Sequence, residues 1–177
     1  MRPPERIETN RLALRVPTRA DARAIFETYT QDPEVTRYVI WRPNTQIEQA
    51  EQFIAACLEA WEGERRFPYI VTLRGRDDPI GMVDFHINGS TVGLGYVFGR
   101  LYWGHGYATE AVRAVIDWAF RQPAIYRVHA SCDVENAASA RVMEKAGMQR
   151  EGILRRYLVH PNIGDEPRDC YLYAIVK

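Results

Sequence analysis

The sequence has no excess of charge of either sign. It contains 23 lysine and arginine residues and 23 aspartate and glutamate residues, so its formal net charge at pH 7 is zero. Proteins that bind nucleic acid or an anionic membrane surface through electrostatics usually carry a basic excess. The balance therefore predicts that neither nucleic acid nor a membrane is a partner.

The sequence also lacks long apolar runs and has little cysteine. The stretch MRPPERIETNRLALR has no apolar segment of signal-peptide length, and no later stretch is long enough to span a bilayer. The three cysteines, Cys57, Cys132 and Cys170, are far apart and odd in number, which argues against a disulfide framework or a zinc site. These features predict a cytoplasmic protein without a bound metal.

The remaining composition is that of a globular protein. Of the 177 residues, 46% are hydrophobic and 26% are charged, which are ordinary fractions for a chain that folds around one core. No internal repeat, low-complexity tract or linker interrupts the sequence. We therefore expect a single domain over residues 1–177.

The patterning predicts the order of the elements. Alternating apolar and polar residues predict strands at 11–16, 67–73, 80–87, 91–98 and 126–134, and on both sides of the turn PNIGDEP. Helical spacing predicts helices that begin at a Thr18–Asp21 capping box, at a Thr45–Glu48 box, near Gly106 and at Asn136. The expected fold class is α/β (α+β): a mixed, largely antiparallel sheet of about six to seven strands flanked by about four helices.

Two glycines in WGHGYATEAVRAVIDWAF (103–120) stand directly before a long amphipathic helix. The first N–H groups of a helix have no intrahelical partner, and the macrodipole adds positive potential there. Bare backbone at this point favours phosphate or pyrophosphate, although a tight strand-to-helix turn would also need glycine. A Walker A loop is excluded because the Gly-Lys-Ser/Thr ending is absent, and the dinucleotide fingerprint lacks its third glycine.

Two longer stretches carry a family resemblance. GYVFGRLYWGHGYATEAVRAVIDWAF and RVHASCDVENAASARVMEKAGMQREG resemble the GNAT acetyltransferases, and the most similar branch is the ribosomal-protein-alanine N-acetyltransferases. The resemblance spans nearly the whole chain, from ETNRLALRVPTRADA to RDCYLYAIV. It implies the GNAT fold, acetyl-CoA as cosubstrate, and transfer of the acetyl group to a primary amine, here a protein N-terminal α-amino group.

The resemblance also implies how CoA is held. The family's loop, Gln/Arg-x-x-Gly-x-Gly/Ala, is matched by Trp103, Gly106 and Ala108. The pyrophosphate would lie against the backbone of Gly104, His105, Gly106, Tyr107, Ala108 and Thr109. The pantetheine arm would pair like an extra strand with the backbone of Tyr96, Val97 and Phe98. Asn136 resembles the asparagine that hydrogen-bonds the pantetheine, a role that is compatible with capping a helix.

The acid that protonates the leaving thiolate is implied to be a serine. Many GNAT proteins use a tyrosine seven residues after the asparagine, but this sequence has Met143 there. The similar branch places a serine three residues after the asparagine, which is Ser139 here. Ser139 is therefore expected to donate a proton or a hydrogen bond to the CoA sulfur, although the same residue could be an ordinary member of the first helical turn.

No base is evident by resemblance. Many relatives carry a glutamate on the strand before the glycine loop, where this sequence has Gly93. Asp84 and His86 lie two residues apart, so both project from one face of the neighbouring strand. Either is a candidate base, directly or through water, and each could equally be a solvated strand residue. Glu110, in the first turn of the helix, is expected to have a structural role or to interact favourably with the positive end of the helix dipole.

The acceptor stays open between several alternatives. Without a strong base, we expect an α-amino group, whose pKa is about 7.7–8.0, to react faster than a lysine near 10.4. A small amine such as a polyamine, amino acid or antibiotic is an alternative acceptor, and a CoA-binding sensor without catalysis is another class. A polyamine site would need a carboxylate cluster, for which the candidates are Asp32, Glu34, Glu48 and Glu51. The protein is expected to be a monomer or homodimer.

Overall fold

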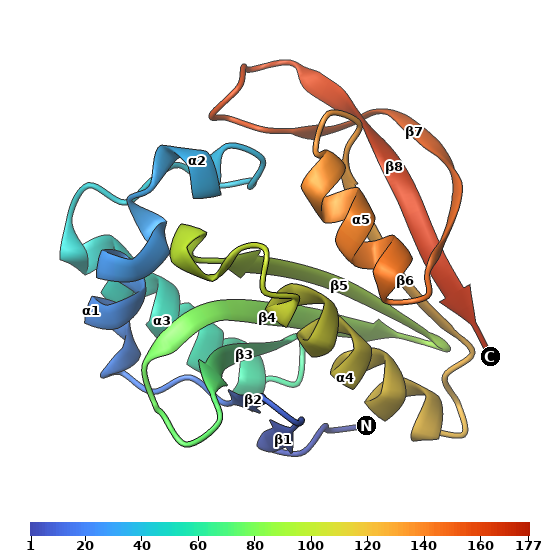
Figure 1. The fold of residues 1–177 in the computed structure, drawn as a ribbon, viewed down its shortest axis with the longest axis horizontal. Helices are drawn as coiled ribbons and strands as arrows, with labels where there is room; N and C mark the ends of the chain where they lie inside the picture. Colours follow the sequence, from blue (N-terminus) through green and yellow to red (C-terminus); the bar gives the residue numbers. More distant parts are fainter.

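The computed structural model describes all 177 residues and is built on one eight-stranded sheet (Figure 1). The strands lie in the order β1-β2-β3-β4-β5-β6-β8-β7. Only β5 and β6 are parallel, and all other neighbours are antiparallel. The strands are β1 (Arg6–Glu8), β2 (Leu12–Arg15), β3 (Phe67–Leu73), β4 (Pro79–Asn88), β5 (Thr91–Phe98), β6 (Arg127–Asp133), β7 (Gln149–Val159) and β8 (Pro167–Val176). The mixed, largely antiparallel sheet is confirmed, with one strand more than expected.

Helices cover both faces of the sheet (Figure 1). The helical segments are α1 (Asp21–Ile25), η1 (Phe26–Thr30), α2 (Pro33–Thr36), α3 (Ile47–Glu62), η2 (Arg100–Tyr102), α4 (Tyr107–Arg121) and α5 (Ala137–Lys145). Helix α1 packs on α3 and β4, whereas α4 packs on β2, β5 and β6, and α5 packs on β6 and β7. None of the helices has the length and apolar character needed to cross a membrane.

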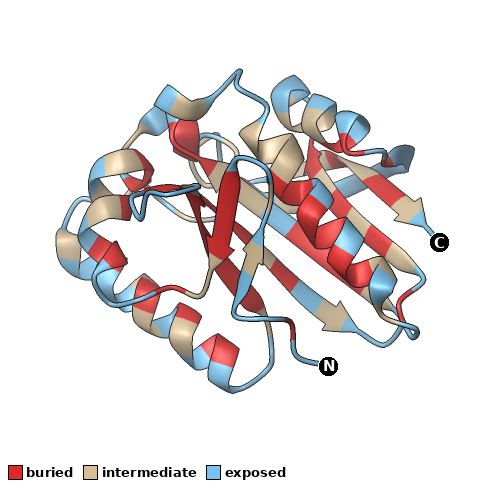
Figure 2. Cartoon of the chain, turned by 60° about the horizontal axis from the view of Figure 1, so that its bottom comes forward, coloured by how far each residue is buried: buried red, intermediate tan, exposed pale blue.

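The two faces have separate cores. A cluster of 27 buried residues lies between the sheet and α4, and a smaller cluster of nine joins α1, η1 and α3 to β3 and β4. Figure 2 shows that buried residues run along the central strands, while the helices are buried on one side only. The side chains of Ile70 and Met82 belong to the smaller cluster, and those of Val83 and Phe85 to the larger one, as the alternation along a strand requires.

The sequence missed one strand and misplaced two helix starts. Strand β1 has only three residues, two of them charged, which is too short for an alternating pattern to be recognised. The Thr45–Glu48 box was wrong by one residue: the N-cap of α3 is Gln46, and its partner is Gln49. Glutamine is not among the preferred caps, so the threonine beside it was chosen instead.

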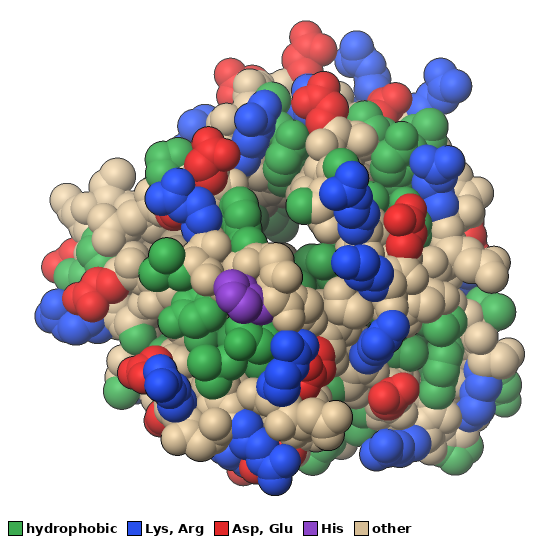
Figure 3. Space-filling model, in the orientation of Figure 1, with side chains coloured by type: hydrophobic (Ala, Val, Ile, Leu, Met, Phe, Trp, Pro, Cys, Tyr) green, Lys and Arg blue, Asp and Glu red, His purple; other side chains and the backbone are tan.

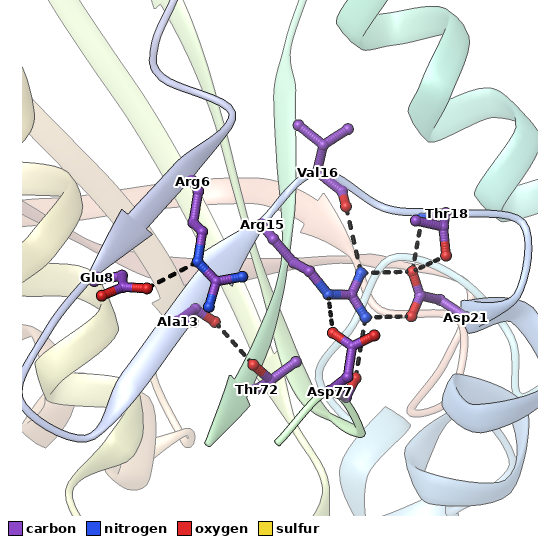
Figure 4. Close-up of polar contacts among 9 residues, drawn as sticks. All are labelled: Arg6, Glu8, Ala13, Arg15, Val16, Thr18, Asp21, Thr72 and Asp77. Atoms are coloured by element: carbon purple, nitrogen blue, oxygen red, sulfur yellow. Dashed lines mark hydrogen bonds and ion pairs between the residues drawn. The ribbon is translucent and has the colours of Figure 1, made fainter. Parts of the chain in front are cut away.

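The Thr18–Asp21 box was also wrong as a cap. Helix α1 starts at Asp21 after Ala20, which makes no side-chain cap, and the carboxylate of Asp21 instead accepts hydrogen bonds from Thr18 N at 2.6 Å and Thr18 Oγ1 at 3.0 Å. The guanidinium of Arg15 donates to both oxygens of Asp21, at 2.7 and 2.8 Å, and to Asp77 Oδ1 at 2.7 Å (Figure 4). Burial would raise the pKa of Asp21, but these hydrogen bonds hold it below its usual value. The cluster anchors α1 to β2 and to the turn between β3 and β4.

Strands β5 and β6 pair over only three residues each. Residues 91–93 of β5 lie beside residues 127–129 of β6, and beyond that point the strands diverge (Figure 1). Strand β5 continues to Phe98 paired only with β4, and β6 continues to Asp133 paired only with β8. Two free backbone edges therefore face each other across a wedge-shaped gap in the middle of the sheet.

Candidate active site

The glycine loop closes one end of the gap. Gly104 has φ +78° and Gly106 has φ +79°, the left-handed region that favours glycine. Gly106 is the N-cap of α4 and offers no side chain to the N–H groups of the first turn. Those N–H groups and the positive end of the α4 dipole therefore remain available to an anion.

The side chains around the loop fix its shape. Trp103 Nε1 donates to Phe98 O at 2.7 Å, which ties the loop to the end of β5. His105 lies with Nδ1 2.8 Å from Trp103 O, and its ring stacks on Tyr107. Arg11 Nη1 donates to His105 O at 3.0 Å. The indole of Trp103 thus supplies a structural contact at the position where the family pattern has glutamine or arginine.

Glu110 anchors the first turn of α4 to the N-terminal hairpin. Its carboxylate accepts hydrogen bonds from Thr9 Oγ1 at 2.6 Å, Arg11 N at 2.9 Å and Arg11 Nε at 2.6 Å. Partial burial would raise the pKa of Glu110, but these hydrogen bonds lower it overall. The carboxylate is thus fully engaged by Thr9 and Arg11, which agrees with the expected structural role.

A cleft of about 1050 Å³ runs through the gap from the glycine loop to the opposite face of the sheet. Figure 3 shows an opening near the middle of the face seen in Figure 1. We call the part beyond the sheet the acceptor end, and we define it by Tyr29, Tyr38, Trp41, Asp84 and His160. A long, thin molecule can therefore reach from the helix N-terminus to the other face.

Ser139 lies at the centre of the cleft, in the first turn of α5. Its Oγ is 2.8 Å from the hydroxyl of Tyr96 on β5, which also lies 3.0 Å from Ser139 O. Asn136 Oδ1 accepts from Ser139 N at 3.1 Å, so the side-chain oxygen of Asn136 caps the helix and its amide N–H groups stay free. Burial raises the pKa of Tyr96, so the phenol keeps its proton at neutral pH.

Asp84 faces the cleft from β4 with one oxygen unpaired. Its Oδ2 lies 2.7 Å from Arg66 Nη1, whereas Oδ1 is buried and has no hydrogen-bond partner. Burial raises the pKa of Asp84, and the positive charges of Arg66 and His86 oppose that rise. A carboxylate with a raised pKa and a free oxygen is suited to take a proton.

His86 lies over Gly93. A Cβ atom placed on Gly93 would clash with His86 Cε1 and would be 2.7 Å from His86 Nε2, closer than real Cβ atoms approach a neighbour. The imidazole of His86 therefore fills the space that a side chain at position 93 would need, which explains a glycine in the middle of β5. His86 is exposed and lies on the same sheet face as Asp84.

Comparison with known proteins agrees with this arrangement. The family model for the acetyltransferase (GNAT) domain matches residues 11–149. The chain belongs to the GNAT acetyltransferase family. It is 33% identical over 174 residues to the uncharacterized N-acetyltransferase YoaA of Bacillus subtilis, with 97% of this chain and 96% of YoaA covered. The protein is thus an acyltransferase that uses acetyl-CoA.

Solved structures share the fold over the whole length. A GNAT-family acetyltransferase from Bacillus anthracis matches with a TM-score of 0.84 and 33% identity, over 97% of this chain and 98% of that chain. RimL, a ribosomal alpha-N-protein acetyltransferase solved with coenzyme A, matches with a TM-score of 0.83 over 97% of this chain and 98% of that chain. Its identity is 19%, so this second likeness concerns the fold.

The acetyltransferase brings nearly all of the sequence-predicted residues to one cleft. The residues that line it are Asp84, His86, Tyr96, Val97, Phe98, Gly104, Gly106, Tyr107, Ala108, Thr109, Asn136 and Ser139. His105 is the exception, because it is exposed and does not line the cleft. The residues come from β4, β5, the glycine loop and the first turns of α4 and α5, which the divergence of β5 and β6 places around one gap.

Sequence reasoning missed two residues of the acceptor end. Tyr29 in η1 is 1% exposed, and its hydroxyl has no hydrogen-bond partner. His160, after β7, is 3% exposed; its Nε2 lies 3.7 Å from Asp133 Oδ2, and its Nδ1 has no partner. No local motif surrounds either residue, so the sequence offered no signal for them.

The four carboxylates considered for a polyamine site do not form a cluster in the cleft. Only Glu34 of the four lines the cleft. Asp32 pairs with Arg100 at 3.0 Å and accepts from Glu34 N at 2.9 Å, as the N-cap of α2. Glu48 and Glu51 are absent from the lining of the cleft. The structure also holds no group of three His, Cys, Asp or Glu side chains that could bind a metal ion.

Proposed function

We propose that this acetyltransferase moves the acetyl group of acetyl-CoA to the α-amino group at a protein N-terminus. The observation that carries the choice of amine is the one buried carboxylate oxygen in the cleft without a hydrogen-bond partner, Asp84 Oδ1, on a carboxylate whose charge is already opposed by Arg66. A lysine ammonium, with a pKa of about 10.4, needs strong help to lose its proton, whereas an α-amino group near 7.7–8.0 is substantially neutral. Weak basic help suits the second amine.

The glycine-loop end would hold the CoA. Backbone N–H groups of residues 104–109 would bind the pyrophosphate at the start of α4, where Gly106 leaves the approach open. The free edge of β5 at Tyr96, Val97 and Phe98 would pair with the amides of the pantetheine arm. The unengaged amide N–H groups of Asn136 would add a hydrogen bond.

The chemistry would then run across the gap. The neutral amine attacks the thioester carbonyl, and a free N–H on the β5 edge stabilises the oxyanion. Asp84 takes the proton from the amine, directly or through water, and the exposed His86 on the same face is the alternative acceptor. The carbon–sulfur bond breaks, and the sulfur takes the proton of Ser139, whose Oγ is hydrogen-bonded to the hydroxyl of Tyr96. The proton taken up by Asp84 then returns to the oxygen of Ser139 through water, so both side chains end as they began.

The catalytic unit would be the whole chain. The family model ends at residue 149, but β8 pairs with β6 along seven residues, on the side away from the gap, and so supports the strand that forms one wall of it. Leu158 in β7 and His160, which follows β7, also line the cleft. We therefore assign residues 1–177 to one domain.

The choice of amine gives a first test. Acetylation of a peptide with a free α-amino group and no lysine is expected to proceed at least about tenfold faster at pH 7 than acetylation of the matched N-blocked peptide with one lysine, because about a thousandth of a lysine amine is neutral there. Thiol release from acetyl-CoA measures both rates. A clear preference for the lysine peptide would contradict the proposal and would indicate a stronger base than Asp84.

Ser139→Ala gives a second test. The change removes one oxygen and leaves α5 capped by Asn136. It takes away the hydroxyl that is hydrogen-bonded to Tyr96 and is the proposed proton donor. Turnover is expected to fall by roughly tenfold to a hundredfold, at the lower end of general acid catalysis because a thiolate already leaves readily. The affinity for acetyl-CoA should change little. Steady-state kinetics and calorimetry measure the two effects.

The control is Ser131→Ala. Ser131 lines the same cleft from β6 without a hydrogen bond to Tyr96, so its loss should leave turnover near that of the wild type. Tyr96→Phe should reproduce part of the Ser139→Ala effect, because it removes the hydrogen bond that holds Ser139 Oγ in place. Unchanged turnover in Ser139→Ala, under conditions where chemistry limits the rate, would leave Ser139 with only its place in the helix.

A further inference from the structure

All three buried side-chain polar atoms that lack a hydrogen-bond partner belong to residues that line the same cleft. They are Tyr29 Oη, Asp84 Oδ1 and His160 Nδ1. Buried polar groups in folded proteins are almost always hydrogen-bonded, because leaving one unpaired costs about 1–3 kcal/mol. Three residues of the acceptor end carry such an atom and no other residue does, which indicates a place where a bound molecule supplies the partners.

The three atoms differ in what they can bind. The ionised Asp84 Oδ1 accepts hydrogen bonds. With the imidazole proton on Nε2, which faces Asp133 Oδ2 at 3.7 Å and Cys170 Sγ at 3.9 Å, His160 Nδ1 is an acceptor. The phenol of Tyr29 is protonated, because burial raises its pKa, and it can donate. The set offers two acceptors and one hydroxyl donor.

Apolar side chains form the walls between these atoms. They come from α2 and the segment after it, from α3 and from β4: Val35, Tyr38, Val39, Trp41, Phe53 and Met82. Tyr38 packs edge-on against His160, with the ring centroids 6.3 Å apart. The charged side chains nearby, Glu34, Arg37 and Arg66, are of mixed sign and give no field that would select a polycation.

A bridge of hydrogen bonds crosses between the two sides of the acceptor end. Asn162, in the turn between β7 and β8, donates through Nδ2 to Thr36 O at 2.6 Å and to Trp41 O at 2.8 Å. Arg42 Nη1 donates to Pro161 O at 3.2 Å. The bridge joins the segment after α2 to the turn of the β7–β8 hairpin, so an extended chain fits the entrance better than a folded surface does.

We propose that the acceptor is an extended peptide N-terminus whose first residue has a large apolar side chain. The inference rests on the proposed function and names its substrate class. The α-amine would donate to Asp84 Oδ1, a peptide N–H to His160 Nδ1, and the hydroxyl of Tyr29 would donate to a peptide carbonyl. The apolar side chain would lie among Tyr38, Trp41 and Phe53. Such a peptide would supply hydrogen-bond partners to the three unpaired polar atoms and an apolar side chain to the apolar walls.

A peptide series tests the inference. Peptides that differ only in the first residue, Phe, Leu, Ser, Asp or Lys with its side chain acetylated, are compared by kcat/KM with acetyl-CoA, and spermidine is included as a polyamine. Burying a Phe or Leu side chain is expected to favour those peptides over Ser and Asp by roughly tenfold to a hundredfold. Preference for Ser, Asp or spermidine overturns the inference but leaves an acetyltransferase. Acetyl-CoA binding without acetylation of any peptide overturns the proposed function as well.

Tyr29→Phe isolates one of the three atoms. Because the hydroxyl of Tyr29 has no partner in the folded chain, its removal should leave Tm unchanged or higher. The KM for the Phe peptide should rise by roughly threefold to tenfold, the worth of one hydrogen bond, while acetyl-CoA affinity stays constant. Tyr69→Phe is the matched control, because that hydroxyl donates to Pro4 O at 2.5 Å outside the cleft. It should lower Tm and leave KM unchanged, and an unchanged KM in Tyr29→Phe overturns the assignment of its hydroxyl.

Discussion

Gly106→Val is expected to weaken CoA binding by roughly a hundredfold or more in a protein that still folds. Gly106 has φ +79° at the N-cap of α4, and a Cβ there would meet only Arg11 Nη2, at 3.5 Å. The added isopropyl group would otherwise stand in open space at the mouth of the glycine loop, where an anion would approach the first N–H groups. Calorimetric titration with CoA measures the affinity, and circular dichroism checks the fold.

A valine at a second glycine separates the effect on CoA binding from the effect on folding. A valine in the left-handed region costs about 1–2 kcal/mol wherever it stands, so Gly106→Val loses some stability even without a ligand. Gly75 has φ +80° with nothing within 4 Å of its Cβ position, and it lies in the turn between β3 and β4, away from the cleft. Gly75→Val should lose similar stability and keep its CoA affinity. Equal CoA affinity in the two variants would reduce Gly106 to a turn residue.

The parts of the fold that sequence predicted well are those with local patterns. Strands β3 and β5 have the predicted bounds, and β4 extends the predicted 80–87 by one residue at each end. The run over 67–73 is apolar and β-branched, and turns rich in glycine and aspartate separate it from its neighbours. The short β1 was missed because three residues carry no recognisable pattern and the strand is held by its pairing with β2. The Gln46 cap was missed because glutamine is not among the preferred caps, although its partner Gln49 is only three residues away.

The same contrast between local sequence patterns and contacts made by packing explains which site residues could be predicted. The glycine loop, Asn136 and Ser139 lie within short contiguous motifs, so their position at the start of α4 and of α5 could be read from the sequence. The partners of Glu110 could not, because Thr9 and Arg11 are about a hundred residues away in sequence. The unpaired atoms of Tyr29 and His160 could not be predicted either, because only the packed structure shows that a buried polar atom lacks a hydrogen-bond partner.

The sequence predicted Asp84 and His86 as two equivalent candidate bases and could not choose between them. The strand period places Asp84 and His86 on one face, but only the packing shows that Asp84 has a buried free oxygen while His86 is exposed over Gly93. This difference in burial makes Asp84 the better candidate base. It also makes the two residues a matched pair for experiment, since they share a strand and a face and differ in access to solvent.

Asp84→Asn is expected to lower turnover by about 10²-fold, the lower end of general base catalysis, because a partly neutral α-amine needs only weak basic help. The amide keeps the size of the carboxyl group and an oxygen for Arg66, but it cannot take a proton. The carboxyl must be ionised to act, and burial raises the pKa of Asp84. Wild-type turnover should therefore fall as pH is lowered through that raised pKa, at a higher pH than for an ordinary aspartate, and the variant should lack this acid limb. His86→Asn should keep the limb and most of the turnover. If instead His86→Asn loses the turnover and Asp84→Asn does not, the exposed imidazole over Gly93 is the proton acceptor, and the free oxygen of Asp84 serves only to bind the amine.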